Sequence, residues 1–268
     1  MYMKLSKILM FAALFALTAC GGGKGAEVDE AKAKEVAKNI STETKAVKNL
    51  DFEMELITTD VDKNVDKSTY TYKLSENGDL FAGATGSSKD GNANSQLYRV
   101  KNDEYEEVLY YHTFNHDAKT NKDDESTVCY GKKGNETVYT TMSASIGTAA
   151  IMSVEMVYSS VADPSVVLAE AAKDQSYDVK YYSSGDKNLT IELKFNGQKG
   201  SSDADEDPIK SATATYTYSN GLLAKFEASS EYDSGEKMTQ KAEAKYSNVK
   251  ISLPDGWKDL VNKATISF

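Results

Sequence analysis

The spacing of apolar and polar residues changes several times along the chain, and each change predicts a different element. Residues 27–49 contain good helix formers and neither Gly nor Pro. In a helix over this range, Val36, Ile40 and Val47 lie near one face, while Glu and Lys cover the other. We expect a first helix from 27 to 49 whose apolar face rests on a larger surface.

Residues 50–142 follow period two, which is typical of strands with one buried face. Apolar side chains alternate with polar neighbours at Phe52, Met54 and Leu56, and again at Tyr70, Tyr72 and Leu74. Further strands are expected near 79–85, 95–101, 104–114, 125–131 and 135–142. Short turn-like segments separate them, such as 76–79, 90–92 and 132–135, so the pattern predicts a meander of hairpins.

Residues 143–174 interrupt this alternation with helical spacing. One helical face would contain Ile146, Ala150, Val154, Val157 and Val161, and Met152 and Met156 would widen it. Asp163-Pro164 then predicts an N-cap and a first-turn proline for a second helix that includes Leu168. This segment is too apolar to lie exposed, so we expect it to cover part of the sheet.

Alternation resumes at Tyr177, with strands expected near 177–183, 188–195, 209–219, 222–231 and 237–251. Ser219-Asn220-Gly221 predicts a tight turn, and the segment after Leu253 predicts a short helical turn. Alanines recur at alternate strand positions: 82 and 84, 212 and 214, 242 and 244. Such small residues leave volume either for a ligand or for a closely packed helix, and the sequence leaves both explanations open.

The first twenty residues differ from the rest of the chain. Lys4 and Lys7 precede an unbroken apolar run from Ile8 to Ala16, which is about half the length that a membrane span needs. Leu17-Thr18-Ala19-Cys20 follows and resembles the bacterial lipobox. That resemblance implies cleavage of signal peptide 1–19 and attachment of fatty acyl chains, such as palmitate, to Cys20. The alternative is an ordinary secretory signal with a chance Cys.

The predicted organisation after cleavage is a lipidated Cys and flexible tether, residues 20–26, followed by one domain over 27–268. Two or three acyl chains anchor a protein stably where a single chain is marginal. We therefore expect a cell-envelope location, lipid-anchored on the outer face of the cytoplasmic membrane or in the outer membrane. No later segment is apolar enough to suggest a second span.

Composition narrows the possible partners. The formal net charge is −10, and cleavage would remove Lys4 and Lys7 but no acidic residue. Such a protein repels nucleic acid, so a DNA- or RNA-binding function is excluded. The chain contains 17 Tyr and only 3 Pro, which favours strands over loops.

No catalytic constellation is recognisable. A Gly-rich phosphate loop, a serine nucleophile elbow and a zinc-protease helix motif are all missing from the sequence. We therefore predict a protein that is not an enzyme and needs neither cofactor nor metal. Cys129, alone in the mature chain, is interpreted as a small buried hydrophobic residue, because nothing in the sequence places a His beside it.

Three other polar features were weighed as metal sites. His112 and His116 are interpreted as lying on different faces, because this stretch is predicted as a strand end and turn and not as a helix. Residues 60–66 begin like an EF-hand loop but lack its Gly and carry Thr71 at the position of its Glu. Both this segment and the acidic segment 203–207 are interpreted as solvated turns.

The order of predicted elements resembles the LolA/LolB and LppX/LprG group of bacterial lipoprotein and lipid carriers. The resemblance rests on the mid-chain segment 162–168 with a strand at Tyr177, and on 245–251 leading into Leu253-Pro254. It implies an α+β, mainly β fold: a curved antiparallel meander, or incomplete barrel, with the N-terminal and central helices packed on its concave face. It supplies no binding residues that match position by position.

The leading hypothesis is a membrane-anchored, non-enzymatic lipoprotein that binds an apolar or amphiphilic ligand, such as lipid or acyl chains, between sheet and helices. Candidate ligand-binding residues are Tyr70, Tyr72, Leu74, Ile146, Met152, Val154, Met156, Val157 and Leu168. The rival is a surface lipoprotein with a packed interior that binds a protein, glycan or cell-wall partner through Tyr-rich strands such as 108–111 and 180–182. A hydrolase with an unrecognised site comes third.

Overall fold

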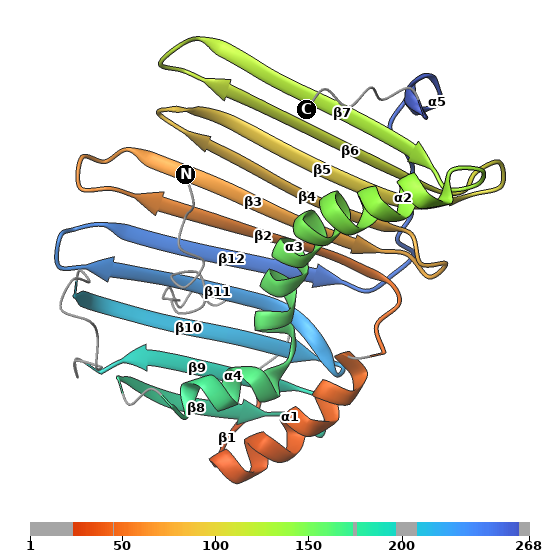
Figure 1. Ribbon diagram of the computed structural model, residues 1–268. Coiled ribbons are helices and arrows are strands. Elements are labelled where there is room, and N and C mark those ends of the chain that lie inside the picture. The colour runs from red at the N-terminus through yellow and green to blue at the C-terminus, as the bar shows by residue number, and fades with distance from the viewer. Residues whose placement is uncertain (1–23, 45, 174–175, 197–207, 263–268) are drawn as a thin grey trace. The chain divides into compact units, whose positions relative to one another are not determined.

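The computed structural model describes residues 24–44, 46–173, 176–196 and 208–262, with the side chains of 147–153 left out. The signal peptide, Cys20 and the acidic segment 203–207 lie outside the described residues. The chain forms two compact units, which are described separately. Figure 1 labels the helices and strands that they contain. Unit 1 comprises Met1–Ala46, Met54–Val65 and Ser159–Ala244; unit 2 comprises Val47–Glu53, Asp66–Tyr158 and Lys245–Phe268.

The described residues are mainly β, with a small number of helices, as the sequence predicted. The strands are β1 (Ala26–Val28), β2 (Leu50–Thr59), β3 (Val65–Leu74), β4 (Leu80–Ser88), β5 (Gly91–Asn102), β6 (Glu106–Asp117), β7 (Lys122–Gly131), β8 (Tyr177–Ser183), β9 (Leu189–Phe195), β10 (Ile209–Ser219), β11 (Leu222–Tyr232) and β12 (Lys237–Lys245). The helices are α1 (Glu30–Thr44), α2 (Glu136–Met142), α3 (Thr148–Ala162), α4 (Pro164–Ala171) and α5 (Trp257–Leu260), with a π-helical turn, Ser143–Gly147, between α2 and α3.

The strands pair antiparallel, each with its neighbour along the chain in most cases, which confirms the predicted meanders. In unit 1 the order is β1-β8-β9-β10-β11-β12, and in unit 2 it is β3-β4-β5-β6-β7. Among the described residues β1 pairs only with β8, and β7 only with β6, so the strands do not close into a barrel. The curvature of the sheet and its concave face stay predictions.

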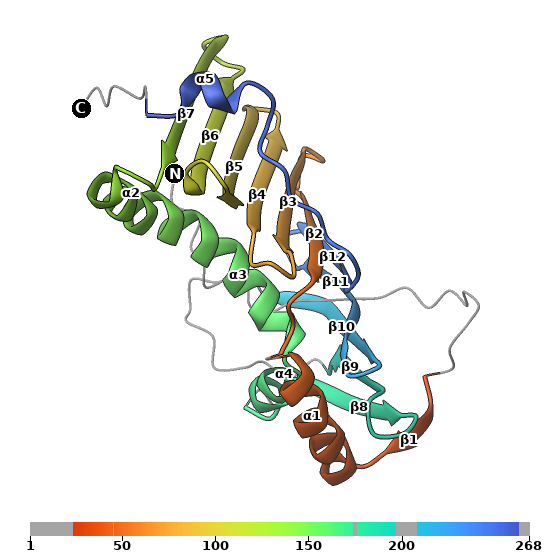
Figure 2. The same ribbon diagram turned by 90° about the vertical axis from the view of Figure 1, so that its right-hand side faces the viewer.

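Helix α1 packs one apolar stripe against unit 1. Ala33, Val36, Ala37 and Ile40 have the i, i+3, i+4, i+7 spacing of a helical face, and each is at most 1% exposed. Helix α1 contacts α4, β8, β9 and β11, and Figure 2 shows it beside α4. The predicted helix 27–49 was too long, because residues 26–28 pair with β8 and Leu50 begins β2.

The start of α4 confirms the predicted Asp163-Pro164 signal. The Asp163 carboxylate accepts a hydrogen bond from the Ser165 backbone N–H at 2.9 Å, and Pro164 occupies the first turn. The Ser41 hydroxyl on α1 also contacts Asp163 Oδ1, at 2.5 Å, and Ser165 Oγ, at 2.7 Å. One carboxylate therefore caps α4 and joins it to α1.

The predicted strand 135–142 is wrong, because these residues form helix α2. Thr, Val and Tyr favour strands only weakly, and tertiary contacts override that preference. In the helix Tyr139 is 4% exposed, and its hydroxyl donates to Glu107 Oε1 on β6 at 2.5 Å. In a strand, successive side chains would point to opposite faces. The helical backbone that brings the Tyr139 hydroxyl to Glu107 would then be lost.

The end of β12 is a second correction, while the predicted turns are confirmed. Strand 237–251 was expected, but β12 ends at Lys245, and Asn248 has a positive φ of 38° that interrupts extended backbone. Asn220 and Gly221 both have positive φ, 52° and 82°, as a two-residue hairpin turn requires.

The shared role of Asp163 leads to a stability prediction. Asp163→Ala removes the α4 cap and the contact with Ser41, so we expect the free energy of unfolding to fall by about 1–2 kcal/mol. Urea denaturation followed by circular dichroism measures this change. Glu170→Ala is the matched control, because Glu170 is an exposed acid on the same helix that forms an ion pair with the exposed Lys173. Equal effects of the two substitutions would contradict the assigned role of Asp163.

Candidate functional site

The predicted ligand-binding residues divide between the two units. Leu168 belongs to unit 1 and is 4% exposed; the others belong to unit 2. Of these, Tyr72 and Val154 are buried, Met156 is 48% exposed, and Tyr70, Leu74, Ile146 and Val157 are half-buried. The Met152 side chain lies outside the described residues. The structure places Tyr72 on β3 beside Tyr158 on α3 in unit 2.

The centre of that layer is Tyr158, near the C-terminal end of α3. Its ring centroid lies 5.1 Å from that of Phe52, in an edge-on arrangement, and 6.2 Å from that of Tyr72. Phe52 is 0% exposed, and Tyr158 is 8% exposed. Aromatic pairs of this geometry contribute about 0.5–1.5 kcal/mol each beyond the burial of their area. We call Phe52, Tyr72, Tyr158 and Tyr246 the aromatic layer.

Two hydroxyl groups meet in the aromatic layer without a good hydrogen bond. The Tyr158 and Tyr246 hydroxyls interact with each other, and burial raises the pKa of both phenols. Both oxygens are inaccessible to solvent and lack a well-formed hydrogen-bond partner. Buried polar atoms are nearly always satisfied, so this pair is a place where a water molecule or a polar ligand atom would gain two hydrogen bonds.

Charged groups approach the aromatic layer from α3 and β5. Burial, with a smaller contribution from the negative charge of Glu155, raises the pKa of the Tyr72 phenol to about 12, and Arg99 acts in the opposite direction. Register places Arg99 opposite Leu80 and Tyr72 opposite Ala82, so these residues share one face of the β3–β5 strands. The phenol is therefore kept neutral at physiological pH.

The helices of this region also carry apolar side chains on their outer sides. Val138 on α2 is 40% exposed and Met156 on α3 is 48% exposed, whereas Val154 is 2% exposed. In unit 1, Val166 on α4 is likewise 44% exposed. The sheet thus covers only part of the apolar surface of α2, α3 and α4. Exposed apolar side chains on several helices are typical of surfaces that meet apolar ligands, partners or lipid.

The opposite face of unit 2 holds a separate core under the C-terminal segment. Val108, Tyr110, Cys129 and Val261 are buried together, and Trp257 packs edge-on against Tyr105 with ring centroids 5.9 Å apart. Cys129 is 0% exposed, as expected for a small hydrophobic residue, and burial raises its thiol pKa to about 11. A thiol in this state is a poor nucleophile.

The two histidines lie on one face of β6, contrary to the prediction. Strand β6 extends to Asp117, and residues four apart in a strand point to the same side. His112 Nδ1 lies 2.9 Å from Thr127 Oγ1, and His116 Nδ1 lies 2.7 Å from Asp123 Oδ1, both across the β6–β7 pair. In the described part of the chain, no three His, Cys, Asp or Glu side chains gather in a geometry that could hold a metal ion.

Asp60 confirms the interpretation of residues 60–66 as a turn. Its carboxylate accepts hydrogen bonds from the Asn64 backbone N–H at 2.8 Å and from Asn64 Nδ2 at 2.7 Å. Both carboxylate oxygens therefore act inside the turn. The arrangement is an Asp-stabilised turn of the kind that short acidic loops commonly form.

Sequence reasoning missed three of the four residues of the aromatic layer as site candidates. Phe52 appeared only as a strand residue, and Tyr158 stands four residues after Val154, which is the spacing of one helical face. Tyr246 was assigned to a strand. The i, i+4 relation to Val154 was the one signal that could have added Tyr158, whereas nothing local places Tyr246 beside it.

Comparisons with known proteins leave the family of the chain open. No protein-family model matches the sequence. No curated protein matches it either. The described helices include none that is both long enough and apolar enough to cross a membrane.

Several solved structures match most of the chain at very low similarity. A DUF1329 family protein from Desulfovibrio piger has 9% identity and a TM-score of 0.26, covering 85% of this chain and 99% of its own. A putative outer membrane lipoprotein-sorting protein domain from Vibrio parahaemolyticus has 9% identity and a TM-score of 0.19, covering 84% and 95%. A β-barrel-like DUF1849 protein from Brucella abortus has 11% identity and a TM-score of 0.16, covering 75% and 98%. TM-scores this low do not establish a shared fold, so the site is argued from its own residues.

The buried phenol of Tyr72 predicts a pH dependence of stability. Because its pKa in the folded state is about 12, above the ordinary value near 10, the unfolded chain releases this proton first as pH rises. Its contribution is fully present below pH ~10 and is lost between pH ~10 and ~12. Urea unfolding at several pH values should show a steeper loss for the wild type than for Tyr72→Phe. Parallel pH profiles would contradict the prediction.

Proposed function

We propose that this chain is a non-enzymatic lipoprotein of the bacterial cell envelope that binds an amphiphilic ligand in the aromatic layer of unit 2. The ligand's apolar part contacts the rings of Phe52 and Tyr72 and the apolar side of α3. Its polar atoms bond to the hydroxyls of Tyr158 and Tyr246. The observation that carries the proposal is this buried hydroxyl pair without a well-formed hydrogen bond, set among aromatic rings.

Two physical arguments support an amphiphile over a purely apolar or a charged ligand. Leaving a hydroxyl buried and unpaired costs about 1–3 kcal/mol, so a ligand that satisfies two of them gains affinity from atoms already desolvated. A charged head group would lose its hydration inside a layer of four aromatic rings. Acylglycerols and the ester- or amide-linked acyl chains of lipoproteins combine an apolar chain with uncharged oxygen atoms.

The rival function, binding a protein or glycan through Tyr-rich strands, has less support. Tyr110 is only 9% exposed, and Tyr111, Tyr181 and Tyr182 are half-buried. Among the described residues, the most exposed large hydrophobic side chains are those of Val61, in the Asp60 turn, and Val65, at the start of β3. An aromatic binding patch would need side chains that stand free of the sheet.

Native mass spectrometry tests the ligand proposal. The body from Lys24 onward, purified gently from a bacterial host, should carry an added mass that denaturation releases and that extraction identifies as a lipid. The double substitution Tyr158→Phe/Tyr246→Phe should reduce the loaded fraction several-fold and leave stability nearly unchanged, because it removes both unpaired hydroxyls together.

Tyr110→Phe is the matched control, since Tyr110 lies in the core on the opposite face. It should leave the loaded fraction unchanged. A clean apo mass that persists after incubation with mixed lipid vesicles would overturn the ligand proposal. Equal loading of the wild type and the double variant would show that the two hydroxyls do not take part in ligand binding.

Lipid anchoring is tested independently through Cys20. Metabolic labelling with an alkyne analogue of palmitate should mark the wild-type protein and place it in the membrane fraction. Cys20→Ala should abolish both the label and the membrane association, because the acyl chains are then absent. Cys129→Ala serves as the control, since the Cys129 thiol is buried and should not carry the label. A labelled, membrane-bound Cys20→Ala variant would contradict the lipobox interpretation.

A further inference from the structure

The N-terminal segment is held against the edge of unit 1 from its first described residue. The Lys24 ammonium forms an ion pair with Glu192 on β9 and lies 5.6 Å from the ring centroid of Tyr182 on β8. Gly25 has a positive φ of 84°, and a Cβ there would lie 2.2 Å from the Ser183 carbonyl oxygen. Only glycine allows so close an approach of the backbone to β8.

Strand pairing and a helix cap continue this attachment. Ala26, Glu27 and Val28 pair with Ser183, Tyr182 and Tyr181 on β8. The Asp29 carboxylate then accepts a hydrogen bond from the Lys32 backbone N–H at 2.8 Å and so caps the N-terminus of α1. Lys24, residues 26–28, Asp29 and Lys32 are thus held in place by an ion pair, strand pairing and a hydrogen bond.

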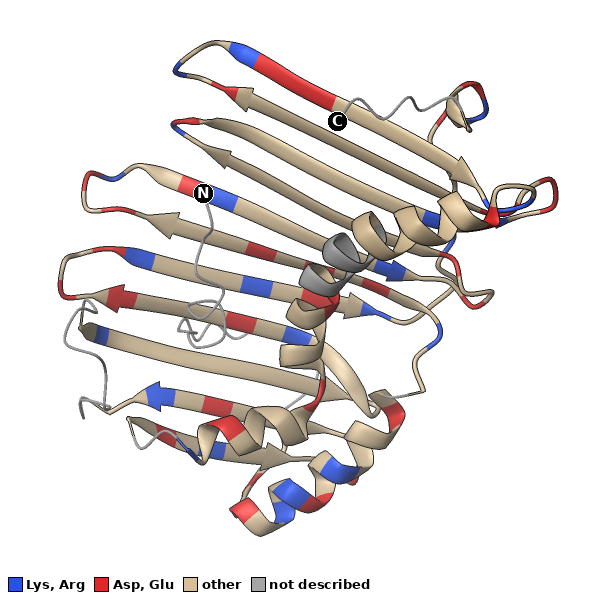
Figure 3. Ribbon diagram, in the orientation of Figure 1, with Lys and Arg blue, Asp and Glu red and all other residues tan. Residues whose placement is uncertain are grey.

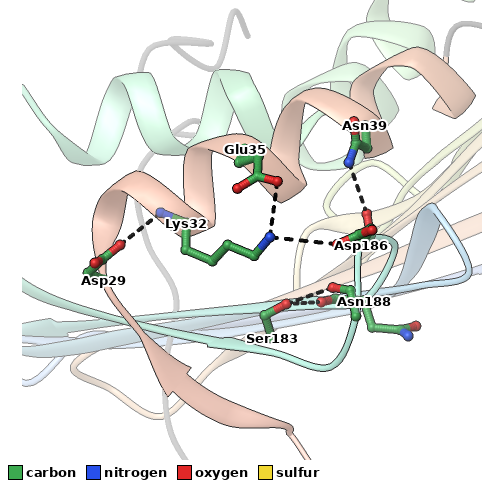
Figure 4. Close-up of polar contacts among 8 residues, drawn as sticks. Asp29, Lys32, Glu35, Asn39, Ser183, Asp186 and Asn188 are labelled. Carbon is green, nitrogen blue, oxygen red and sulfur yellow. Dashed lines mark hydrogen bonds and ion pairs between the residues drawn. The ribbon is translucent and has the colours of Figure 1, made fainter.

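Helix α1 is tied in turn to the β8–β9 turn (Figure 4). Lys32 Nζ lies 3.0 Å from Glu35 Oε1 and 3.6 Å from Asp186 Oδ1, and Asn39 Nδ2 donates to the Asp186 carbonyl at 3.5 Å. Ser183 Oγ donates to the Asn188 carbonyl at 3.1 Å within the same turn. Strand pairing, hydrogen bonds and ion pairs therefore hold β1, β8 and the start of α1 together as one edge of unit 1.

From this arrangement we propose that the β1–β8 edge of unit 1 lies against the lipid head groups of the membrane that anchors the protein. The inference rests on the proposed lipidation of Cys20. Only Gly21, Gly22 and Gly23 stand between Cys20 and Lys24. Fully extended, the four steps from residue 20 to residue 24 span at most ~14 Å. The acylated residue sits at the membrane surface, so the edge cannot move farther from it than that.

The charges on this edge are compatible with a head-group surface, although the chain as a whole is acidic. Three acids at or beside this edge have a lysine partner: Glu192 on β9 with Lys24, Glu27 with Lys180 at 3.8 Å, and Glu30 with Lys34 at 2.6 Å. Asp29 instead caps α1, and Asp178 on β8 accepts a hydrogen bond from Asn196 Nδ2 at 3.4 Å. Figure 3 shows blue and red residues interspersed along α1. An edge with balanced charge escapes the repulsion that an acidic surface would meet at anionic lipid.

Fluorescence quenching in vesicles measures the orientation directly. The full-length lipidated protein is inserted into vesicles of phosphatidylethanolamine and phosphatidylglycerol that contain a nitroxide-headgroup lipid. A bimane label is attached at Lys180→Cys on β8 or, as the matched control, at Lys241→Cys on β12. Both lysines are exposed, and β12 is four strands from β8, about 19 Å away. Native Cys129 is buried and stays unlabelled.

We expect quenching at position 180 to exceed that at 241 several-fold. Inserting twenty Gly and Ser residues after Gly23 should remove the difference, because such a linker has a root-mean-square length of about 25 Å. Equal quenching at the two positions, in protein that floats with the vesicles, would overturn the orientation and leave the anchoring intact. Protein that does not float would overturn the anchoring, and the orientation with it.

Discussion

The contact of Tyr158 with Phe52 and Tyr72 is the interaction on which the proposed binding layer of unit 2 depends. It places a helix ring between two strand rings and brings the Tyr158 hydroxyl to that of Tyr246. A Phe at position 158 would keep the ring but could not bring a polar atom into the layer. The aromatic residues therefore give both packing and a possible point of ligand recognition, as Tyr side chains with an apolar body and a polar tip often do.

Unit 1 depends on a different constraint, the close approach of the N-terminal backbone to β8 at Gly25. That approach allows β1 to pair and lets Asp29 begin α1, which then covers the sheet with Ala33, Val36 and Ile40. The buried alanines 212, 214 and 242 lie on strands of the same unit, each at most 3% exposed. Small residues on strands and on a helix permit tight helix–sheet packing. For the recurring alanines, this explanation requires less than the other one, a volume kept free for a ligand.

Strand prediction succeeded where alternation was strict and turn chemistry was strong. The bounds of 177–183 and 209–219 were predicted correctly, and Asn220-Gly221 forms the expected turn. It failed for 135–142, where Tyr139 finds its buried partner Glu107 only through tertiary contact, and for 246–251, where Asn248 adopts a positive φ. Of the aromatic layer, periodicity pointed to Tyr72 alone as a site candidate, whereas Tyr246 is almost ninety residues from Tyr158 in the chain.

Local patterns in the chain were enough to establish the mainly β class, the antiparallel meanders and the Asp163-Pro164 helix start, because each depends on neighbours a few residues apart. The lipobox resemblance is equally local. The pairing of the Tyr158 and Tyr246 hydroxyls and the hold of Lys24 and Gly25 on β8 required the folded chain. Each of these joins residues through strand register or helix packing, and neither distance nor direction across a sheet is encoded in short-range spacing.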